Sequence, residues 1–203
     1  MIRRIGSLLL VLLLGACGAE GGPRVAVLGP VEPVVLPVWQ TTITPSDTLR
    51  LQSLPAALAD LAPRLPARTR PLTQPDAALA YPALSPGSYR CRAVTAARRP
   101  ATDFCYISET PDGLAFAKQT GANPAAGYLH LDGKRYIFLG ARQRRAGENG
   151  LGYGADSSRD LVGMIERVGN FRWRLAIAGT AQPLLYELTP VPPEQQPGGR
   201  MAR

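Results

Sequence analysis

Four residues in this sequence belong to types that often carry chemistry: three cysteines and one histidine. Cys17 directly follows an unbroken apolar run, Cys91 and Cys105 lie in the stretch YRCRAVTAARRPATDFCY, and His130 lies in GYLHLDG. A cysteine can be a nucleophile, a metal ligand, half of a disulfide or a point of attachment. Because each role needs different neighbours, the surroundings of each cysteine decide its chemistry.

The residues before Cys17 indicate an attachment point. Arg3 and Arg4 precede an apolar core that is too short to cross the ~30 Å of a bilayer as a helix, and small residues follow it. This order is typical of a secretory signal, here residues 1–16. The order Leu-Gly-Ala-Cys at residues 14–17 resembles the lipobox of bacterial lipoproteins, whose signal is cut before the cysteine and whose cysteine is acylated. The resemblance implies a membrane anchor at Cys17; the alternative is an ordinary cleaved signal with an incidental cysteine.

The residue after Cys17 and the net charge give expectations about location and partners. By resemblance to the sorting rule of enteric bacteria, Gly18 rather than Asp implies the outer membrane, so we expect a protein anchored there and facing the periplasm. The net charge of +8 would suit a protein that binds nucleic acid. An exported, anchored protein meets little of it, so we expect no nucleic-acid partner. Anionic lipid head groups or an acidic partner are the alternatives.

Cys91 and Cys105 are predicted to form a structural disulfide. Export places them in an oxidising compartment, and lipidation of Cys17 leaves an even pair. A redox or metal pair is the alternative, but the chain has no C-x-x-C spacing. Zinc would also need more ligands than His130 and two cysteines readily provide. We therefore expect neither a metal nor another cofactor.

The sequence does not favour an enzyme. His130 is the only histidine, and a nucleophile–base–orienter array would have to combine it with residues such as Ser88, Ser108 or Asp132. There is no Gly-x-Ser-x-Gly elbow, and the glycines of GLGYGADSS lack the context of a phosphate-binding loop. No carboxylate pair has a spacing that selects glycosidase chemistry. A hydrolase is the less favoured alternative to a non-catalytic protein.

The first part of the mature chain is predicted to be a tether followed by a helix. Residues 17–38 carry the lipidated cysteine and several prolines that oppose a helix, so we expect an extended tether. Ser46 is a good N-cap for a helix over residues 46–62, and Pro55 indicates two short helices or one that restarts. Residues 66–87 have the composition of an irregular, proline-rich linker within a segment 39–87.

From residue 88 onward the hydrophobic pattern changes to period two, which predicts strands. Eight strands with short turns predict an antiparallel up-and-down β-barrel of the lipocalin or avidin type over residues 88–190. They are expected at 88–95, 103–109, 113–119, 126–131, 134–141, 161–168, 171–178 and 184–189. Residues 191–203 are predicted to be a disordered tail.

Large side chains are predicted to point into the barrel, so a filled core is favoured over a ligand cavity. These inward residues are Tyr89, Phe116, Phe171, Trp173, Leu175 and Ile177. On the same alternation Phe104 and Tyr106 point outward. We expect the leucine face of the helix at 46–62 to cover them, because exposed neighbouring aromatics need cover.

Several segments resemble an uncharacterised family of bacterial exported proteins known as a domain of unknown function. They are GSYRCR, FCY, FAKQTG, KRYIFLG, GYGADSSRDLVGMIERVGNFRWRLAI and YELTP, within residues 39–190. This resemblance implies no catalytic residues. The plan is also similar to the inhibitors of alkaline metalloproteases, which are small eight-stranded barrels with an early disulfide. Those inhibitors insert a free N-terminal segment into the protease, whereas here the N-terminus would be lipidated.

The longest interruption between strands, residues 142–160, is the candidate binding loop, because long loops inside a compact domain are often functional. Arg142, Arg144 and Arg145 have the chemistry to grip a carboxylate or phosphate, and Tyr153 could supply a rigid contact. Asp156, Arg159 and Asp160 complete the candidate set. A solvated loop, or pairing of Arg159 and Asp160 at the barrel rim for structure only, is the alternative.

Two functions follow from these expectations. The first is a lipid-tethered binding or inhibitor module that presents a loop or barrel end to an envelope protein or small ligand. The second is a structural or assembly accessory of the bacterial envelope.

Overall fold

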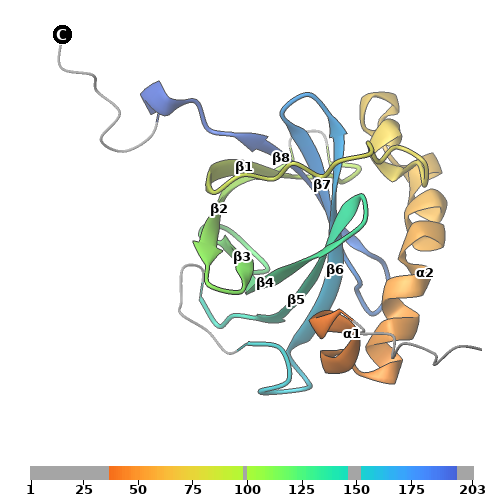
Figure 1. The fold of residues 1–203 in the computed structure, drawn as a ribbon. Helices are drawn as coiled ribbons and strands as arrows, with labels where there is room; N and C mark the ends of the chain where they lie inside the picture. Colours follow the sequence, from red (N-terminus) through yellow and green to blue (C-terminus); the bar gives the residue numbers. More distant parts are fainter. Residues whose placement is uncertain (1–36, 98–99, 146–151, 196–203) are drawn as a thin grey trace, which may run out of the picture. The chain divides into compact units, whose positions relative to one another are not determined.

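Eight antiparallel strands close into a barrel in the computed structural model, which describes residues 37–97, 100–145 and 152–195 (Figure 1). Each strand pairs with the next, and the last pairs with the first. The strands are β1 Gly87–Ala93, β2 Thr102–Thr110, β3 Gly113–Lys118, β4 Ala125–Asp132, β5 Arg135–Arg142, β6 Asp160–Gly169, β7 Arg172–Ile177 and β8 Leu184–Pro190. The predicted fold class is confirmed. The predicted signal, Cys17 and most of the tether lie outside the described residues.

The barrel interior is filled with side chains, as the size of the inward residues predicted. Tyr89 meets Trp173 edge to face with 5.7 Å between ring centroids, and Phe116 meets Phe138 in the same way at 5.6 Å. Residues from all eight strands contribute to this one cluster. The barrel is therefore a packed core rather than an open ligand cup.

Phe171 does not join this core, which corrects one inward assignment. It lies with Asn170 in the turn between β6 and β7, has a φ of 51° and is 73% exposed. The alternation that holds for Trp173, Leu175 and Ile177 ends at Arg172, because β7 begins there. The turn, rather than the pleat, sets the direction of this side chain.

The segment just before β1 crosses one end of the barrel (Figure 1). The backbone N–H of Leu79 donates to the Arg167 carbonyl at 2.8 Å, and the Trp173 indole donates to the Pro82 carbonyl. The Tyr89 hydroxyl donates to the Ser85 carbonyl at 2.7 Å. Leu84 is buried in the barrel core. The segment thus closes this end of the barrel.

The helical part consists of α1 Val38–Thr42, α2 Pro45–Leu61 and the 3₁₀ helices η1 Ala62–Arg64 and η2 Ala67–Thr73. Thr44, rather than the predicted Ser46, is the N-cap of α2 and accepts from the Asp47 N–H at 3.2 Å. The helix also runs through Pro55 without a break, although an interior proline costs about 3 kcal/mol. Burial of leucines on both sides of Pro55 against the barrel opposes that cost. None of the described helices is long and apolar enough to span a membrane.

Helix α2 covers a different face of the barrel from the one expected. Its buried residues Leu51, Leu54 and Leu58 share a cluster with outward side chains of β5 to β8, among them Ile137 and Met164. Figure 1 shows the helices beside β6 to β8 and away from β2. Phe104 and Tyr106 on β2 point outward as predicted and stay 45% and 41% exposed.

The start of the expected irregular linker is ordered by a buried arginine. Arg174 on β7 donates to the Leu72 carbonyl at 2.9 Å and to the Gln74 carbonyl at 2.6 Å, which holds η2 against the barrel. Its Nε also donates to Glu166 at 2.7 Å. Burial of this pair is tolerated because the guanidinium has further acceptors. At the other terminus, the predicted tail begins with a buried Val191 and the 3₁₀ helix η3 Pro193–Gln195.

These charges belong to a row that runs around the outside of the barrel with alternating sign. Successive strand partners in the row are Arg92, Glu187, Arg174, Glu166, Arg135 and Asp132, from β1 through β8 and back to β4. Ion pairs join Arg92 to Glu187, Arg174 to Glu166 and Arg135 to Asp132. Opposite charges across strands favour one register, because a slip of one residue would place them on the wrong face.

Candidate functional site

Four strand connections gather at the barrel end opposite the one that Leu84 closes, and the candidate loop is one of them. They join β1 to β2, β3 to β4, β5 to β6 and β7 to β8. Hairpin-connected antiparallel strands place alternate turns at opposite ends, so these four share an end. We call it the loop end.

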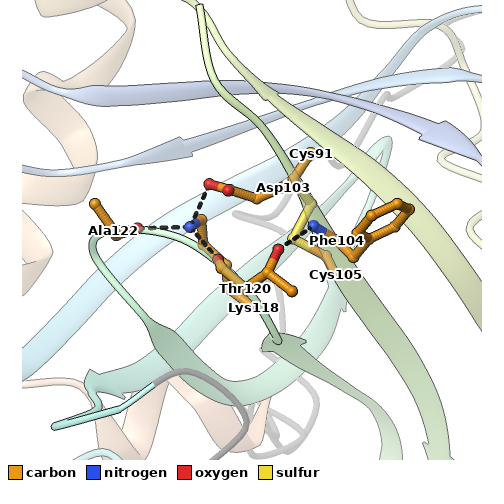
Figure 2. The surroundings of a disulfide bond; sticks show 7 residues. All are labelled: Cys91, Asp103, Phe104, Cys105, Lys118, Thr120 and Ala122. Atoms are coloured by element: carbon orange, nitrogen blue, oxygen red, sulfur yellow. Dashed lines mark hydrogen bonds and ion pairs between the residues drawn. A yellow bond between two sulfur atoms is a disulfide. The ribbon is translucent and has the colours of Figure 1, made fainter.

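The predicted disulfide lies inside the barrel near the loop end (Figure 2). Cys91 on β1 and Cys105 on β2 are bonded, with 5.9 Å between their Cα atoms, and both side chains are buried. The bond links neighbouring strands across the β1–β2 connection. Its burial suits a structural role and not that of an exposed redox pair.

Next to the disulfide lies a buried lysine that the sequence analysis did not single out. The Nζ of Lys118 lies 2.6 Å from the Asp103 carboxylate and donates to the Thr120 and Ala122 carbonyls at 2.7 and 2.5 Å (Figure 2). Lys118 is only 2% exposed. An ammonium has three donors, and these three acceptors match them.

This lysine holds the β3–β4 connection over the barrel interior. Its ammonium lies 5.8 Å from the centre of the Tyr186 ring, and burial raises the pKa of the Tyr186 hydroxyl. Gly121 in the connection has a φ of +75°, and a Cβ there would come within 1.9 Å of the Asp103 carboxylate. The alternation of Leu114, Phe116 and Lys118 was the available sequence signal, since it places the lysine inward.

Tyr153 in the candidate loop contacts another part of the chain instead of projecting into solvent. Its hydroxyl donates to the Asp47 carboxylate at 2.7 Å and accepts from the Thr44 N–H at 3.0 Å. Burial raises the pKa of the Tyr153 hydroxyl. The contact ties the second half of the loop to the N-terminus of α2.

Three other candidate residues also make contacts within the chain. Arg159 donates through Nε to the Arg142 carbonyl at 2.8 Å, and Asp160 accepts from the Gly154 N–H at 2.9 Å. Asp156 accepts from the Ser158 hydroxyl at 2.6 Å and from its N–H at 3.1 Å. The Ser158 hydrogen bonds lower the pKa of the Asp156 carboxyl. These contacts give the loop a fixed frame.

Arg142, Arg144 and Arg145 are exposed at the start of the loop. The backbone beneath them is ordered, because Gln143 donates its N–H to the Pro124 carbonyl at 2.9 Å and Arg142 donates to the Arg159 carbonyl at 2.8 Å. Three exposed arginines thus occur within four residues on a hydrogen-bonded stretch of backbone. Arg159 is directed to that stretch, whereas Tyr153 contacts the N-terminus of α2 and Asp160 contacts Gly154.

A groove at the loop end was missed by the sequence analysis. It has a volume of about 350 Å³ and lies between α2 and the β7–β8 connection. Its polar lining residues are Arg50, Ser53, Asp60, Arg64, Thr180 and Gln182. Arg50 already pairs with Asp47 at 2.7 Å and donates to the Ala178 carbonyl at 2.8 Å. Two segments far apart in sequence form the groove, so no local sequence motif predicts it.

The serines considered for catalysis do not lie next to His130. His130 faces outward on β4, whereas Ser108 lies on β2 beyond β3 and Ser88 lies on β1. Burial lowers the pKa of His130, which favours its neutral form. In the described parts of the chain, no group of three or more His, Cys, Asp or Glu residues could hold a metal ion.

A family model matches residues 39–183, and its description is domain of unknown function DUF4893. The chain belongs to this family. The DUF4893 match starts in α1 and extends to the β7–β8 connection, so it covers the helical part before the barrel as well as seven of the eight strands. Searches of curated proteins and of solved structures found no match.

Proposed function

We propose that this DUF4893 protein is a lipid-anchored cell-envelope protein that works as a non-catalytic binding module. The anchor is Cys17, as the lipobox-like residues 14–17 imply, and Gly18 favours the outer membrane facing the periplasm. The packed barrel directs binding to its surface, because the large side chains of the core occupy the space where a lipocalin-type ligand would sit.

The partner surface in this proposal is the first part of loop 142–160. The observation that carries it is the ordered base under Arg142, Arg144 and Arg145, made by Gln143 and Arg159. Ordering in advance lowers the entropic cost of binding. Three clustered guanidinium groups suit a partner that offers carboxylates or phosphates.

An envelope protein with an acidic surface is the partner class that we favour over a small ligand. An exported protease is one form of such a partner, since the barrel plan is similar to that of the alkaline metalloprotease inhibitors. A structural or assembly accessory of the envelope is the second candidate, supported by the anchor alone. A hydrolase has the least support, since His130 and the serines lie on separate strands.

Cross-linking and affinity capture from detergent-solubilised envelopes test this proposal. The wild-type protein should recover a partner in stoichiometric amounts, and changing Arg142, Arg144 and Arg145 together to Ala should weaken that recovery about tenfold or more, as expected for interface anchors. Tyr153 is left intact because it holds the loop. The matched control changes Arg68 and Lys134, exposed cations outside the loop, to Ala. Recovery that the loop variant leaves unchanged would contradict the assignment of the surface.

A further inference from the structure

The outer surface of β2, β3 and β4 forms an apolar face, which we call the aromatic face. It consists of Phe104 and Tyr106 on β2, Ala115 and Ala117 on β3, and Ala126 and Tyr128 on β4. The strand register places Tyr106 beside Ala117 and Ala117 beside Ala126, while Tyr128 lies beside Ala115. Alanines thus form a floor between the aromatic side chains of β2 and those of β4, two strands that lie two strand spacings, or about 10 Å, apart.

The aromatic face is open to solvent among the described residues. Phe104, Tyr106 and Tyr128 are 45%, 41% and 48% exposed. The helices lie over the other half of the barrel, against outward side chains of β5 to β8 (Figure 1). Contiguous exposed apolar surface of this kind is typical of a site that meets a partner or a membrane.

Positive charge flanks this face at β1. Arg90 on β1 is exposed and lies directly beside Phe104 in the strand register. Arginine beside aromatic side chains matches the interface of a bilayer, where aromatic rings lie at the level of the head groups and cations attract anionic lipid.

The described chain begins at the barrel end where β2 joins β3, next to β4. Pro37 and Val38 line a groove of about 540 Å³ with His130 and Leu131 of β4. Val38 and Leu131 are 70% and 61% exposed. Residues 18–36 would join Cys17 to this point, and such a length can span at most about 65 Å when fully extended. A lipid anchor at Cys17 would therefore keep β4 within this distance of the membrane.

We propose that the aromatic face lies on the surface of a bilayer that contains anionic lipid. This inference rests on the proposed lipid anchor, which would supply a high local concentration of membrane. Phe104, Tyr106 and Tyr128 enter the head-group region, and Arg90 pairs with a lipid phosphate. A second copy of the chain is the less suitable occupant, because a two-fold contact through this face would bring the arginines of both copies into one interface.

Vesicle binding of the whole chain from residue 17, with Cys17→Ser to remove the acyl chains, tests the inference. The chain should float with vesicles of phosphatidylcholine and phosphatidylglycerol, and less with phosphatidylcholine alone. The variant Phe104→Ser, Tyr106→Ser, Tyr128→Ser should bind the mixed vesicles roughly tenfold more weakly, since each buried aromatic contributes apolar transfer energy. The matched control is Tyr81→Ser with Phe171→Ser, two aromatics that are 77% and 73% exposed elsewhere on the surface. It should bind like the parent chain.

Three outcomes would overturn the inference: no flotation of the parent chain, equal binding by the face variant, or a dimer in analytical ultracentrifugation that the face variant abolishes. Thermal unfolding of each variant checks that the barrel is intact. Because the tested chain carries no lipid, a negative result in the vesicle experiment would not contradict the proposed acylation of Cys17. Likewise, a finding that Cys17 is not acylated in the cell would not change the result of the vesicle experiment.

Discussion

The disulfide between Cys91 and Cys105 lies beside the buried ammonium of Lys118, and both hold the loop end of the barrel. The cysteine pair could be predicted from export and cysteine count alone. The structural role of Lys118 could not be predicted in the same way, because its partners are one carboxylate and two backbone carbonyls of the β3–β4 connection. The residue types in a sequence do not show which backbone carbonyls accept a hydrogen bond.

Removing the disulfide should destabilise the barrel. The double variant Cys91→Ala, Cys105→Ala should lose about 2–5 kcal/mol of unfolding free energy, because the unfolded chain is no longer restrained across this connection. Equilibrium urea unfolding measures the difference. Cys17→Ser is the matched control and should leave the unfolding midpoint unchanged. Reaction of both cysteines with a thiol reagent in the unfolded, unreduced wild-type protein would show that the bond is absent.

His130 should make stability depend on pH near neutrality. Burial lowers its pKa in the folded state, so the unfolded chain binds more protons as the pH falls through about 6.5. The free energy of unfolding should therefore decrease between about pH 7.5 and about pH 5.5. His130→Gln should show a smaller decrease over this range, and since the chain has one histidine the difference isolates this group. Parallel curves for the two proteins would contradict the assignment.

At the scale of elements, loop 142–160 is joined to α2 through Tyr153. The sequence identified this tyrosine as a rigid contact, but the structure gives it a partner inside the chain, Asp47. The choice between an internal and an external partner depends on where α2 docks. That docking is set by burial of Leu51, Leu54 and Leu58 against the barrel, a contact between segments about a hundred residues apart.

Tyr153→Phe tests the join between the loop and α2. Loss of the hydroxyl removes the hydrogen bonds to Asp47 and Thr44, so the unfolding free energy should fall by about 0.5–1.5 kcal/mol. Hydrogen exchange should increase at residues 152–160 and at the start of α2. Tyr81→Phe, at an exposed tyrosine, is the control and should change neither measurement. Unchanged exchange in the Tyr153 variant would show that the loop is held by other contacts.

At the scale of the whole molecule, alternation was sufficient to predict eight strands and their closure. The face covered by α2 was predicted wrongly, although a signal for it exists. Residues 137–141 of β5 and 160–165 of β6 are buried on both faces, and the runs IFLGA and DLVGMI are nearly continuous in apolar or small residues. Such a run is typical of a strand covered on both sides, whereas β2 alternates. The contrast between continuous apolar strands and alternating strands would have predicted that α2 covers β5 and β6.

Intact-mass spectrometry of the mature protein, purified from the membranes of the producing cell, is the decisive test of the lipid anchor. We expect a chain that begins at Cys17 and whose mass exceeds that of the polypeptide by a diacylglycerol group and an N-linked acyl chain. Cys17→Ser should lack both additions. A mature chain that begins at another residue and carries no acyl group would contradict the lipid anchor, and with it the proposed place of this protein in the cell envelope.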